Sequence, residues 1–349
     1  MKALTFHGIR NIKYESIADP ILQSHTDAII KVKLCAICGS DLHVYNGSEK
    51  GCDHSTAMGH EFVGEVVEVG DQVTTLRTGE AVMSPFSTSC GQCRFCRIGL
   101  TSRCVHSQLF GWRQNNAGLH GGQSEYIRVP LADNTLLPIP ETLPLEHALL
   151  LGDVIPTGYF CAYQADIDPL GTYVVIGCGA VGLMAIMGAR QLGATSMLAI
   201  DTIPERLHIA ESFGASVLNA QHIDVVSEIH EKTHGHGADA VMEAVGSNSS
   251  LGLAYSLVRP GGIISAVGVN NESTLPFSPA DAYNKNLTFK VGRCPARFLI
   301  EKLLPEVVSG QYDYGAIISH RLKLKEGVEA YSIFSNRADN CVKVVLTCD

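Results

Sequence analysis

The chain has 349 residues, of which 46% are hydrophobic and 17% charged, and its formal net charge is −9. This length suits two domains, and an acidic chain without a basic block is not expected to bind nucleic acid. The longest apolar segments are broken by glycine and too short to span a bilayer, and the first residues lack the apolar core of a signal peptide.

Twelve cysteines in a chain without a secretory signal indicate a reducing compartment, where metal ligands are more frequent than disulfides. We therefore expect a cytoplasmic protein that has no membrane partner.

The first 150 or so residues contain short runs rich in Val and Ile, such as Ala28–Leu34 and Glu61–Val69, punctuated by glycine. This pattern predicts a β-rich domain. The tail of the chain ends in a predicted strand, Cys341–Leu346, and we expect it to return to this first domain. The expected domain therefore comprises residues 1–154 and 294–349.

Four cysteines at sequence steps of three, three and eight stand out within the β-rich part: Cys90, Cys93, Cys96 and Cys104. Four thiolates close a tetrahedral Zn²⁺ site with no position left for a substrate, and the binding energy of the metal then contributes to folding. Four unconnected thiols, or two disulfides, are the alternatives. We predict a structural zinc in a lobe at about residues 87–106.

From residue 155 to residue 293 the pattern changes to strand, glycine turn and helix in repetition. Strands alternating with helices imply a parallel sheet with right-handed crossovers. The predicted strands are Thr172–Ile176, Ser196–Ile200, Val217–Leu218, Ala238–Glu243 and Ile263–Val267, and the predicted helices include Ala180–Leu192 and Pro204–Phe213.

A glycine-rich loop, G-x-G-x-x-G, follows the first of these strands directly and opens a helix. Gly177 permits a tight turn, Gly179 lets the backbone approach a pyrophosphate, and Gly182 allows close packing of helix and strand. The expected pyrophosphate site also includes Ala180 and Val181 at the helix N-terminus. A glycine turn in a sheet that binds nothing is the alternative.

Asp201 ends the next predicted strand, nineteen residues after Gly182. A carboxylate at this place accepts hydrogen bonds from both ribose hydroxyls and repels a 2′-phosphate, so NAD is expected rather than NADP. Arg206 would soften this preference, but we expect it along the adenine or on the surface.

A second set of metal-ligand residues is spread over the first domain: Cys38, His60, Glu61 and Asp153. A catalytic zinc needs three protein ligands and an open fourth position, which a cysteine, a histidine and one carboxylate supply. Taken singly, each residue has an ordinary structural explanation, and their spacing alone does not assemble them.

The chain resembles the zinc-dependent medium-chain alcohol dehydrogenases along essentially its whole length. The segments that carry this resemblance are Cys38–His43, Gly59–Gly64, the four-cysteine lobe, Asp153–Tyr159 and the glycine loop. The resemblance implies a GroES-like β-rich catalytic domain and a Rossmann cofactor domain, hence an α/β fold. It also implies a homo-oligomer, a tetramer in preference to a dimer. We expect edge strands of the cofactor domain near Ile263–Val269 to pair between subunits, because this removes an exposed sheet edge.

The resemblance assigns roles to individual residues. Cys38, His60 and Asp153 match the ligands of the catalytic zinc, and Glu61 matches a carboxylate beside it. Asp153 stands where many members have a cysteine. A carboxylate oxygen is a harder metal ligand than a thiolate sulfur. Ser40 and His43 match a relay that carries the substrate's proton through the cofactor ribose to water. The remaining matches are nicotinamide contacts at Thr157 and Val267, a pyrophosphate contact at Lys343, and substrate-pocket positions at Phe86 and Trp112.

The implied activity is reversible oxidation of a primary or secondary alcohol to an aldehyde or ketone, with hydride transfer to NAD and two zinc ions per chain. Asp153, Trp112 and the run His120–Pro130 resemble two branches with different substrates: the glutathione-independent formaldehyde dehydrogenases and the bacterial secondary-alcohol dehydrogenases. A polyol or amino-alcohol dehydrogenase is the alternative within the family, and a non-catalytic dinucleotide-binding protein is the alternative outside it.

Overall fold

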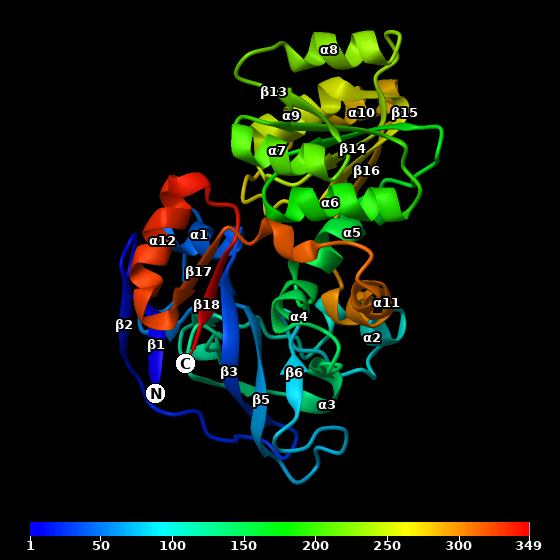
Figure 1. The fold of residues 1–349 in the computed structure, drawn as a ribbon. Helices are drawn as coiled ribbons and strands as arrows, with labels where there is room; N and C mark the ends of the chain where they lie inside the picture. The colour runs from blue at the N-terminus through cyan, green and yellow to red at the C-terminus, as the bar shows by residue number, and fades with distance from the viewer. Residues whose placement is uncertain (349) are drawn as a thin grey trace. The chain divides into compact units, whose positions relative to one another are not determined.

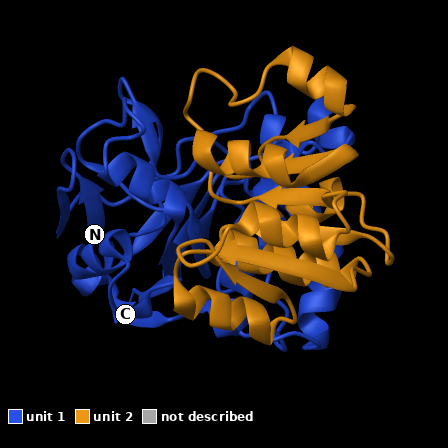
Figure 2. Ribbon diagram, turned by 90° about the horizontal axis from the view of Figure 1, so that it is seen from above, with its two compact units in different colours: residues 1–156, 295–349 blue, residues 157–294 orange. Residues whose placement is uncertain are grey.

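The computed structural model describes residues 1–348, and the chain divides into two units. Unit 1 comprises Met1–Pro156 together with the chain from Pro295 onward, and unit 2 comprises Thr157–Cys294 (Figure 2). The polypeptide thus leaves unit 1 once, forms unit 2, and returns. Within the described residues, no helix combines the length and the apolar character that crossing a membrane requires.

Unit 2 is built on a six-stranded, fully parallel sheet in the order β13-β12-β11-β14-β15-β16 (Figure 1). The strands are β11 (Thr172–Ile176), β12 (Ser196–Asp201), β13 (Ser216–Asn219), β14 (Ala238–Glu243), β15 (Val258–Ala266) and β16 (Thr288–Val291). Most residues of the central strands are buried, as expected for strands covered on both faces.

The helices of unit 2 are α5 (Val154–Gln164, which begins at the end of unit 1), α6 (Ala180–Gln191), α7 (Pro204–Ser212), α8 (Val225–Lys232), α9 (Asn248–Leu257) and α10 (Pro279–Lys285). The strand order reverses at β11, and right-handed crossovers then place α6 and α7 on one face and α8 and α9 on the other. This arrangement confirms the predicted Rossmann fold.

One expectation about this sheet is wrong. We expected a strand near Ile263–Val269 to lie at a sheet edge, but β15 pairs with β14 on one side and with β16 on the other. Its backbone groups are therefore used within the chain and are not free to pair with a second subunit. The outer strand on this side of the sheet is β16, which is only four residues long and carries polar residues, so its sequence gave little signal.

Unit 1 contains three antiparallel or mixed sheets: β2-β1-β4, the hairpin β7-β8, and a seven-stranded sheet in the order β10-β6-β5-β3-β18-β17 with β9 also paired to β3. The strands are β1 (Lys2–Phe6), β2 (Ile12–Ser16), β3 (Ala28–Ile37), β4 (Thr56–Ala57), β5 (Glu61–Val69), β6 (Ala81–Met83), β7 (Trp112–Gln114), β8 (Ala117–Leu119), β9 (Tyr126–Val129), β10 (Leu137–Pro138), β17 (His320–Lys323) and β18 (Val344–Thr347).

The helical segments of unit 1 are short, apart from two near its C-terminal side. They are α1 (Gly39–Tyr45), α2 (Arg94–Arg97), η1 (Thr101–Arg103), α3 (Ala132–Thr135), α4 (Leu145–Leu151), α11 (Ala296–Ser309), η2 (Tyr314–Ile317), η3 (Leu324–Glu326), α12 (Gly327–Asn336) and η4 (Ala338–Asn340). The β-rich character confirms the predicted GroES-like part of the fold.

The returning tail contributes β18, which is shorter than the predicted strand Cys341–Leu346. The backbone N–H groups of Val342 and Lys343 both donate to Ser319 Oγ, at 2.9 and 3.2 Å. Because a side chain takes these donors, the regular ladder begins only at Val344.

The register around β3 decides what lies at one end of the large sheet. Ala36 pairs with Glu61 of β5, and Ile37 pairs with Val344 of β18. Since β5 and β18 both run antiparallel to β3, the residue after β3, Cys38, lies at the same end as the residues just before β5 and β18, which are His60 and Lys343.

Candidate functional site

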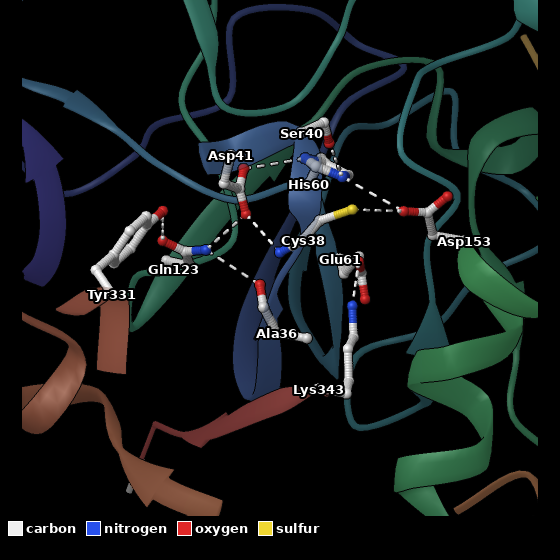
Figure 3. Close-up of polar contacts among 10 residues, drawn as sticks. All are labelled: Ala36, Cys38, Ser40, Asp41, His60, Glu61, Gln123, Asp153, Tyr331 and Lys343. Carbon is white, nitrogen blue, oxygen red and sulfur yellow. Dashed lines mark hydrogen bonds and ion pairs between the residues drawn. The ribbon is translucent and has the colours of Figure 1, made fainter. Parts of the chain in front are cut away.

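The residues at this end of the sheet form a metal-ligand cluster. One ligand atom from each of Cys38, His60, Glu61 and Asp153 lies within 4.8 Å of the others. Asp153 Oδ2 is 3.7 Å from Cys38 Sγ and 3.4 Å from His60 Nε2 (Figure 3). Asp153 comes from the turn between α4 and α5, so three separate parts of the chain supply the cluster.

Cys38 is held at the N-terminus of α1. It is the N-cap residue with an extended backbone, and its N–H donates to Asp41 Oδ2 at 3.0 Å. A carboxylate three residues after the N-cap is a common way to satisfy a free N–H at a helix start. The short helix α1 therefore begins at the place where β3 delivers the thiol.

The imidazole of His60 is oriented from both sides. Asp41 Oδ1 lies 3.3 Å from Nδ1, whereas Nε2 faces Asp153 and lies 3.3 Å from Ser40 Oγ (Figure 3). A carboxylate on one ring nitrogen fixes the tautomer and leaves the other nitrogen for a metal. Although burial lowers the pKa of His60, Asp41 and Asp153 raise it well above its usual range.

Glu61 is buried and pairs with Lys343. The Lys343 ammonium lies 2.5 Å from Glu61 Oε1, and both side chains are almost fully enclosed. The structure thus places Lys343 beside the metal-ligand cluster, and its expected pyrophosphate contact stays a prediction. Burial raises the pKa of Glu61, against the lowering effect of Lys343.

The cluster fits a divalent cation. Within residues 1–348, the buried oxygen Oε2 of Glu61 has no hydrogen-bond partner. Burial, together with Asp153 and Glu61, raises the pKa of the Cys38 thiol. Three groups that are anionic when ionised share this buried site, and a bound cation would stabilise the charged form of each. Sulfur, nitrogen and oxygen ligands in this combination suit zinc.

Four further residues were predicted to act at this site: Ser40, His43, Phe86 and Trp112. Ser40 and His43 lie three residues apart on α1, which places them on one face of the helix. The Phe86 ring is buried and lies edge-on to His60, with 6.5 Å between ring centroids. Trp112 lies in β7 and packs against the hydrophobic core of unit 1, so its place in a substrate pocket stays a prediction.

The four cysteines of the lobe converge as predicted. The sulfur atoms of Cys90, Cys93, Cys96 and Cys104 lie within 4.8 Å of one another, and all four are free thiols. The backbone N–H groups of Cys93 and His106 point at the sulfur atoms of Cys90 and Cys104, each at 3.4 Å. Such N–H···S contacts favour thiolates, and the convergence of four sulfurs fits a closed metal site.

The surroundings of two lobe thiols shift their pKa values in opposite directions. Hydrogen bonds from backbone N–H groups of Cys96 and Val105 lower the pKa of Cys93 to about 6. Burial raises the pKa of Cys96 to about 12. A metal ion bound to all four sulfurs would stabilise every thiolate.

The glycine loop of unit 2 has the geometry that its motif predicts. Gly177 has φ of +89°, which favours glycine, and a Cβ on Gly182 would lie 1.7 Å from the carbonyl oxygen of Gly177. Gly179 is the N-cap of α6. The loop therefore leads into the open N-terminus of α6, where backbone N–H groups and the helix dipole favour a phosphate.

Asp201 is tied to this loop. Its Oδ2 accepts a hydrogen bond from the N–H of Cys178 at 2.7 Å, and its Oδ1 accepts from the N–H groups of Thr202 and Ile203. A carboxylate offers about four acceptor sites, so about one remains for a ribose hydroxyl. We expected Asp201 to accept hydrogen bonds from both ribose hydroxyls, which would need two free acceptor sites.

Arg206 lies over the loop and not out on the surface of unit 2. Its guanidinium would come within 3.8 Å of a Cβ placed on Gly179, and the residue is half-buried. A cation at this place is close to where the motif predicts a pyrophosphate. The effect of Arg206 on the choice of cofactor stays a prediction.

The two predicted nicotinamide residues lie near elements that support the loop. Thr157 precedes Gly158, where a Cβ would lie 2.4 Å from the backbone of Met184 in α6. Val267 follows β15, and its N–H donates to the carbonyl of Glu243 at 3.0 Å. Their contacts with a cofactor stay predictions.

Three residues at the metal-ligand cluster were missed in the sequence: Asp41, Gln123 and Tyr331. The spacing of Asp41 from Cys38 was a usable signal, because three residues separate an N-cap from its capping carboxylate. Gln123 and Tyr331 gave no local signal, since each lies in a different part of the chain from the ligands.

Comparison with known proteins agrees with this geometry. Residues 24–141 match the family described as the alcohol dehydrogenase GroES-like domain, and residues 180–307 match the zinc-binding dehydrogenase family. The zinc-type alcohol dehydrogenase B of Aspergillus flavus is 40% identical over 343 residues, which cover 96% of this chain and 79% of that protein.

Two further relatives extend the comparison. The NADP-dependent isopropanol dehydrogenase of Clostridium beijerinckii is 31% identical, with 99% of each chain covered. The solved structure of alcohol dehydrogenase TADH from Thermus sp. ATN1 superimposes with a TM-score of 0.93 at 38% identity, covering 99% of each chain. From its sequence, its fold and its two cysteine-containing ligand clusters, this chain belongs to the zinc-dependent medium-chain alcohol dehydrogenase family.

Proposed function

We propose that this protein oxidises a primary or secondary alcohol reversibly to an aldehyde or ketone, with NAD as the hydride acceptor. The observation that carries the proposal is the convergence of Cys38, His60, Glu61 and Asp153 at one buried site. Phe86, whose apolar ring lies beside His60, favours a substrate with an apolar part over a polyol.

In this proposal Cys38, His60 and Asp153 hold a catalytic zinc. Zinc in such a site supplies Lewis-acid polarisation of the substrate oxygen. Asp41 keeps Nε2 of His60 directed into the site, and Glu61 remains available beside it, paired with Lys343. Ser40 and His43 would form the relay that carries the proton of the substrate hydroxyl through the cofactor ribose to water, with Ser40 at its inner end and His43 as the outer acceptor.

The cofactor would be held by unit 2. The glycine loop and the N-terminus of α6 would bind the pyrophosphate, and Asp201 would bind the adenosine ribose. Thr157 and Val267 would orient the nicotinamide, which itself carries the hydride chemistry. Lys343 would neutralise Glu61 and, as a further part of the proposal, approach the pyrophosphate.

The surroundings of the enzyme are also part of the proposal. All twelve cysteines are free thiols, which suits a reducing cytoplasm. We infer a homo-oligomer, a tetramer in preference to a dimer, in which β16, one of the two outer strands of the unit 2 sheet, pairs between subunits. Light scattering at micromolar concentration measures this state.

A substrate panel tests the function. Primary alcohols, secondary alcohols, polyols and formaldehyde are offered to the zinc-loaded enzyme, with NAD⁺ and NADP⁺ in parallel. We expect turnover of simple alcohols with NAD⁺. Turnover restricted to polyols would replace the proposal by the polyol alternative, and turnover of no alcohol at all would contradict it.

The lobe and the cluster should each hold one zinc. We expect elemental analysis to find two zinc ions per wild-type chain and about one in Cys96→Ser, together with a lower melting temperature, because the lobe metal contributes folding energy. Cys52→Ser is the matched control, since Cys52 lies outside both clusters, and it should retain two. One zinc or none in the loaded wild type would refute this assignment.

Asp201 and Arg206 should act in opposite directions on cofactor choice. In Asp201→Ala we expect kcat/KM with NAD⁺ to fall by about tenfold or more, since one good polar contact is worth about 1.4 kcal/mol or more, and the preference over NADP⁺ to shrink. Arg206→Ala should weaken NADP⁺ more than NAD⁺. Steady-state kinetics with both cofactors measures this, and a wild-type preference for NADP⁺ would overturn the role of Asp201.

His43 should affect proton transfer without affecting the metal. In His43→Gln we expect two zinc ions and a rate lower by about ten- to a hundredfold, toward the lower end for general acid–base groups because water substitutes in part. The loss should be greatest below neutral pH, and small added bases should restore part of the rate. Loss of zinc would make His43 a ligand, and an unchanged rate at every pH would rule out the relay.

A further inference from the structure

We propose that Gln123 and Tyr331 are positioning residues for the catalytic zinc site, because they hold Asp41 and through it the ligands His60 and Cys38. The inference rests on the proposed function only in taking this cluster as the zinc site. It adds two residues that do not touch metal or substrate, one of them on the C-terminal helix α12.

A continuous series of hydrogen bonds leads from α12 to the ligands (Figure 3). Tyr331 Oη donates to Gln123 Oε1 at 2.8 Å, and Gln123 Nε2 donates to Asp41 Oδ2 at 3.2 Å. Asp41 Oδ2 also accepts the N–H of Cys38, and Asp41 Oδ1 lies 3.3 Å from His60 Nδ1. One carboxylate therefore contacts two of the three expected zinc ligands, and the series ends on it.

The environment of Gln123 determines which way its amide points. Nε2 faces two acceptors, Asp41 Oδ2 and the carbonyl oxygen of Ala36, the latter at 3.0 Å. An amide NH₂ has two N–H groups, so both are used. Oε1 is then at the other end, where it accepts from Tyr331. The Tyr331 hydroxyl therefore favours this orientation of the amide. In the reversed orientation the amide oxygen would face the Asp41 carboxylate and repel it.

Gln123 also braces the backbone that carries His60. A Cβ on Gly59 would lie 2.4 Å from Gln123 Cγ, and Gly59 has φ of +86°. The N–H of Gln123 donates to the carbonyl of Met58, and the N–H of Gly122 donates to the carbonyl of Gly59. The side chain thus lies against the residue just before His60 while it bonds to Ala36, two residues before Cys38.

The whole series is shielded from water. Gln123 and Tyr331 are fully buried, and Asp41 is 5% exposed. Burial, with Asp41 nearby, raises the pKa of Tyr331 well above its usual range, so the phenol remains a donor. Buried polar groups that are all hydrogen-bonded favour one local structure. Removing one partner leaves a buried polar group without a hydrogen bond, which is costly because water does not reach it.

The test is the zinc affinity of the cluster in Tyr331→Phe. This variant keeps the buried ring and removes only the hydroxyl. Loss of a group that contacts a ligand costs about 10–100-fold in metal affinity. Tyr331 acts two contacts further out, so we expect the affinity to fall by about three- to tenfold. Competition with a chromogenic chelator measures it, with the lobe zinc as an internal reference that should not change. Tyr45→Phe removes a hydroxyl from the ring packed against Tyr331, outside the series, and should match the wild type.

A second variant separates positioning from general stability. Gln123→Met has a similar shape and no amide, and we expect at least as large a loss of zinc affinity. Adding Tyr331→Phe to Gln123→Met should cause little further loss, because both act along one path. Variants that melt earlier but bind the cluster zinc within twofold of wild type would overturn the inference, and so would additive losses. A wild type that binds only the lobe zinc would overturn the proposed function, and this inference with it.

Discussion

The register of β5 and β18 against β3 is the constraint on which the metal-ligand cluster depends. Because Ala36 faces Glu61 and Ile37 faces Val344, a thiol, an imidazole, a carboxylate and an ammonium arrive at one end of one sheet. A slip of one residue in either ladder would turn Glu61 or Lys343 to the opposite face. The strand pairing that forms the sheet therefore also brings the residues of the polar site together.

The buried charges at this site are costly to stability, and they fit the proposed metal-binding function. Glu61 and Lys343 lie almost fully enclosed, and buried ion pairs recover their cost of desolvation only in favourable geometry. Two ionisable ligands and Glu61 share the space, so the metal-free pocket holds more potential negative charge than Lys343 alone balances. The same imbalance would give a divalent cation its affinity. In the proposed function, a bound cation would convert this unfavourable pocket into a strong site.

The sequence allowed prediction of those features whose residues lie close together along the chain. The cysteine lobe spans fifteen residues and the glycine loop six, and both have the expected geometry because short spacing fixes which side chains meet. The cluster of Cys38, His60 and Asp153 needed the resemblance, since strand pairing brings these ligands together. The Gln123–Tyr331 bond joins residues 208 apart, and the Glu61–Lys343 pair joins residues 282 apart. No local pattern marks such contacts. The edge strand was misplaced for a similar reason, because the four residues of β16 are recognisable only beside β15.

The interruption of unit 1 by unit 2 has a consequence for biosynthesis. The lobe is complete once Cys104 has emerged from the ribosome, whereas Tyr331 and Lys343 follow only after the 138 residues from Thr157 to Cys294. At about 5–20 residues per second, that segment alone takes roughly seven to thirty seconds to translate. During this interval a nascent chain has Cys38, His60 and Asp153 but neither the partner of Glu61 nor the donor to Gln123. In the function proposed above, translation would therefore impose an order on metal uptake, in which the lobe would be filled early and the catalytic site would mature last.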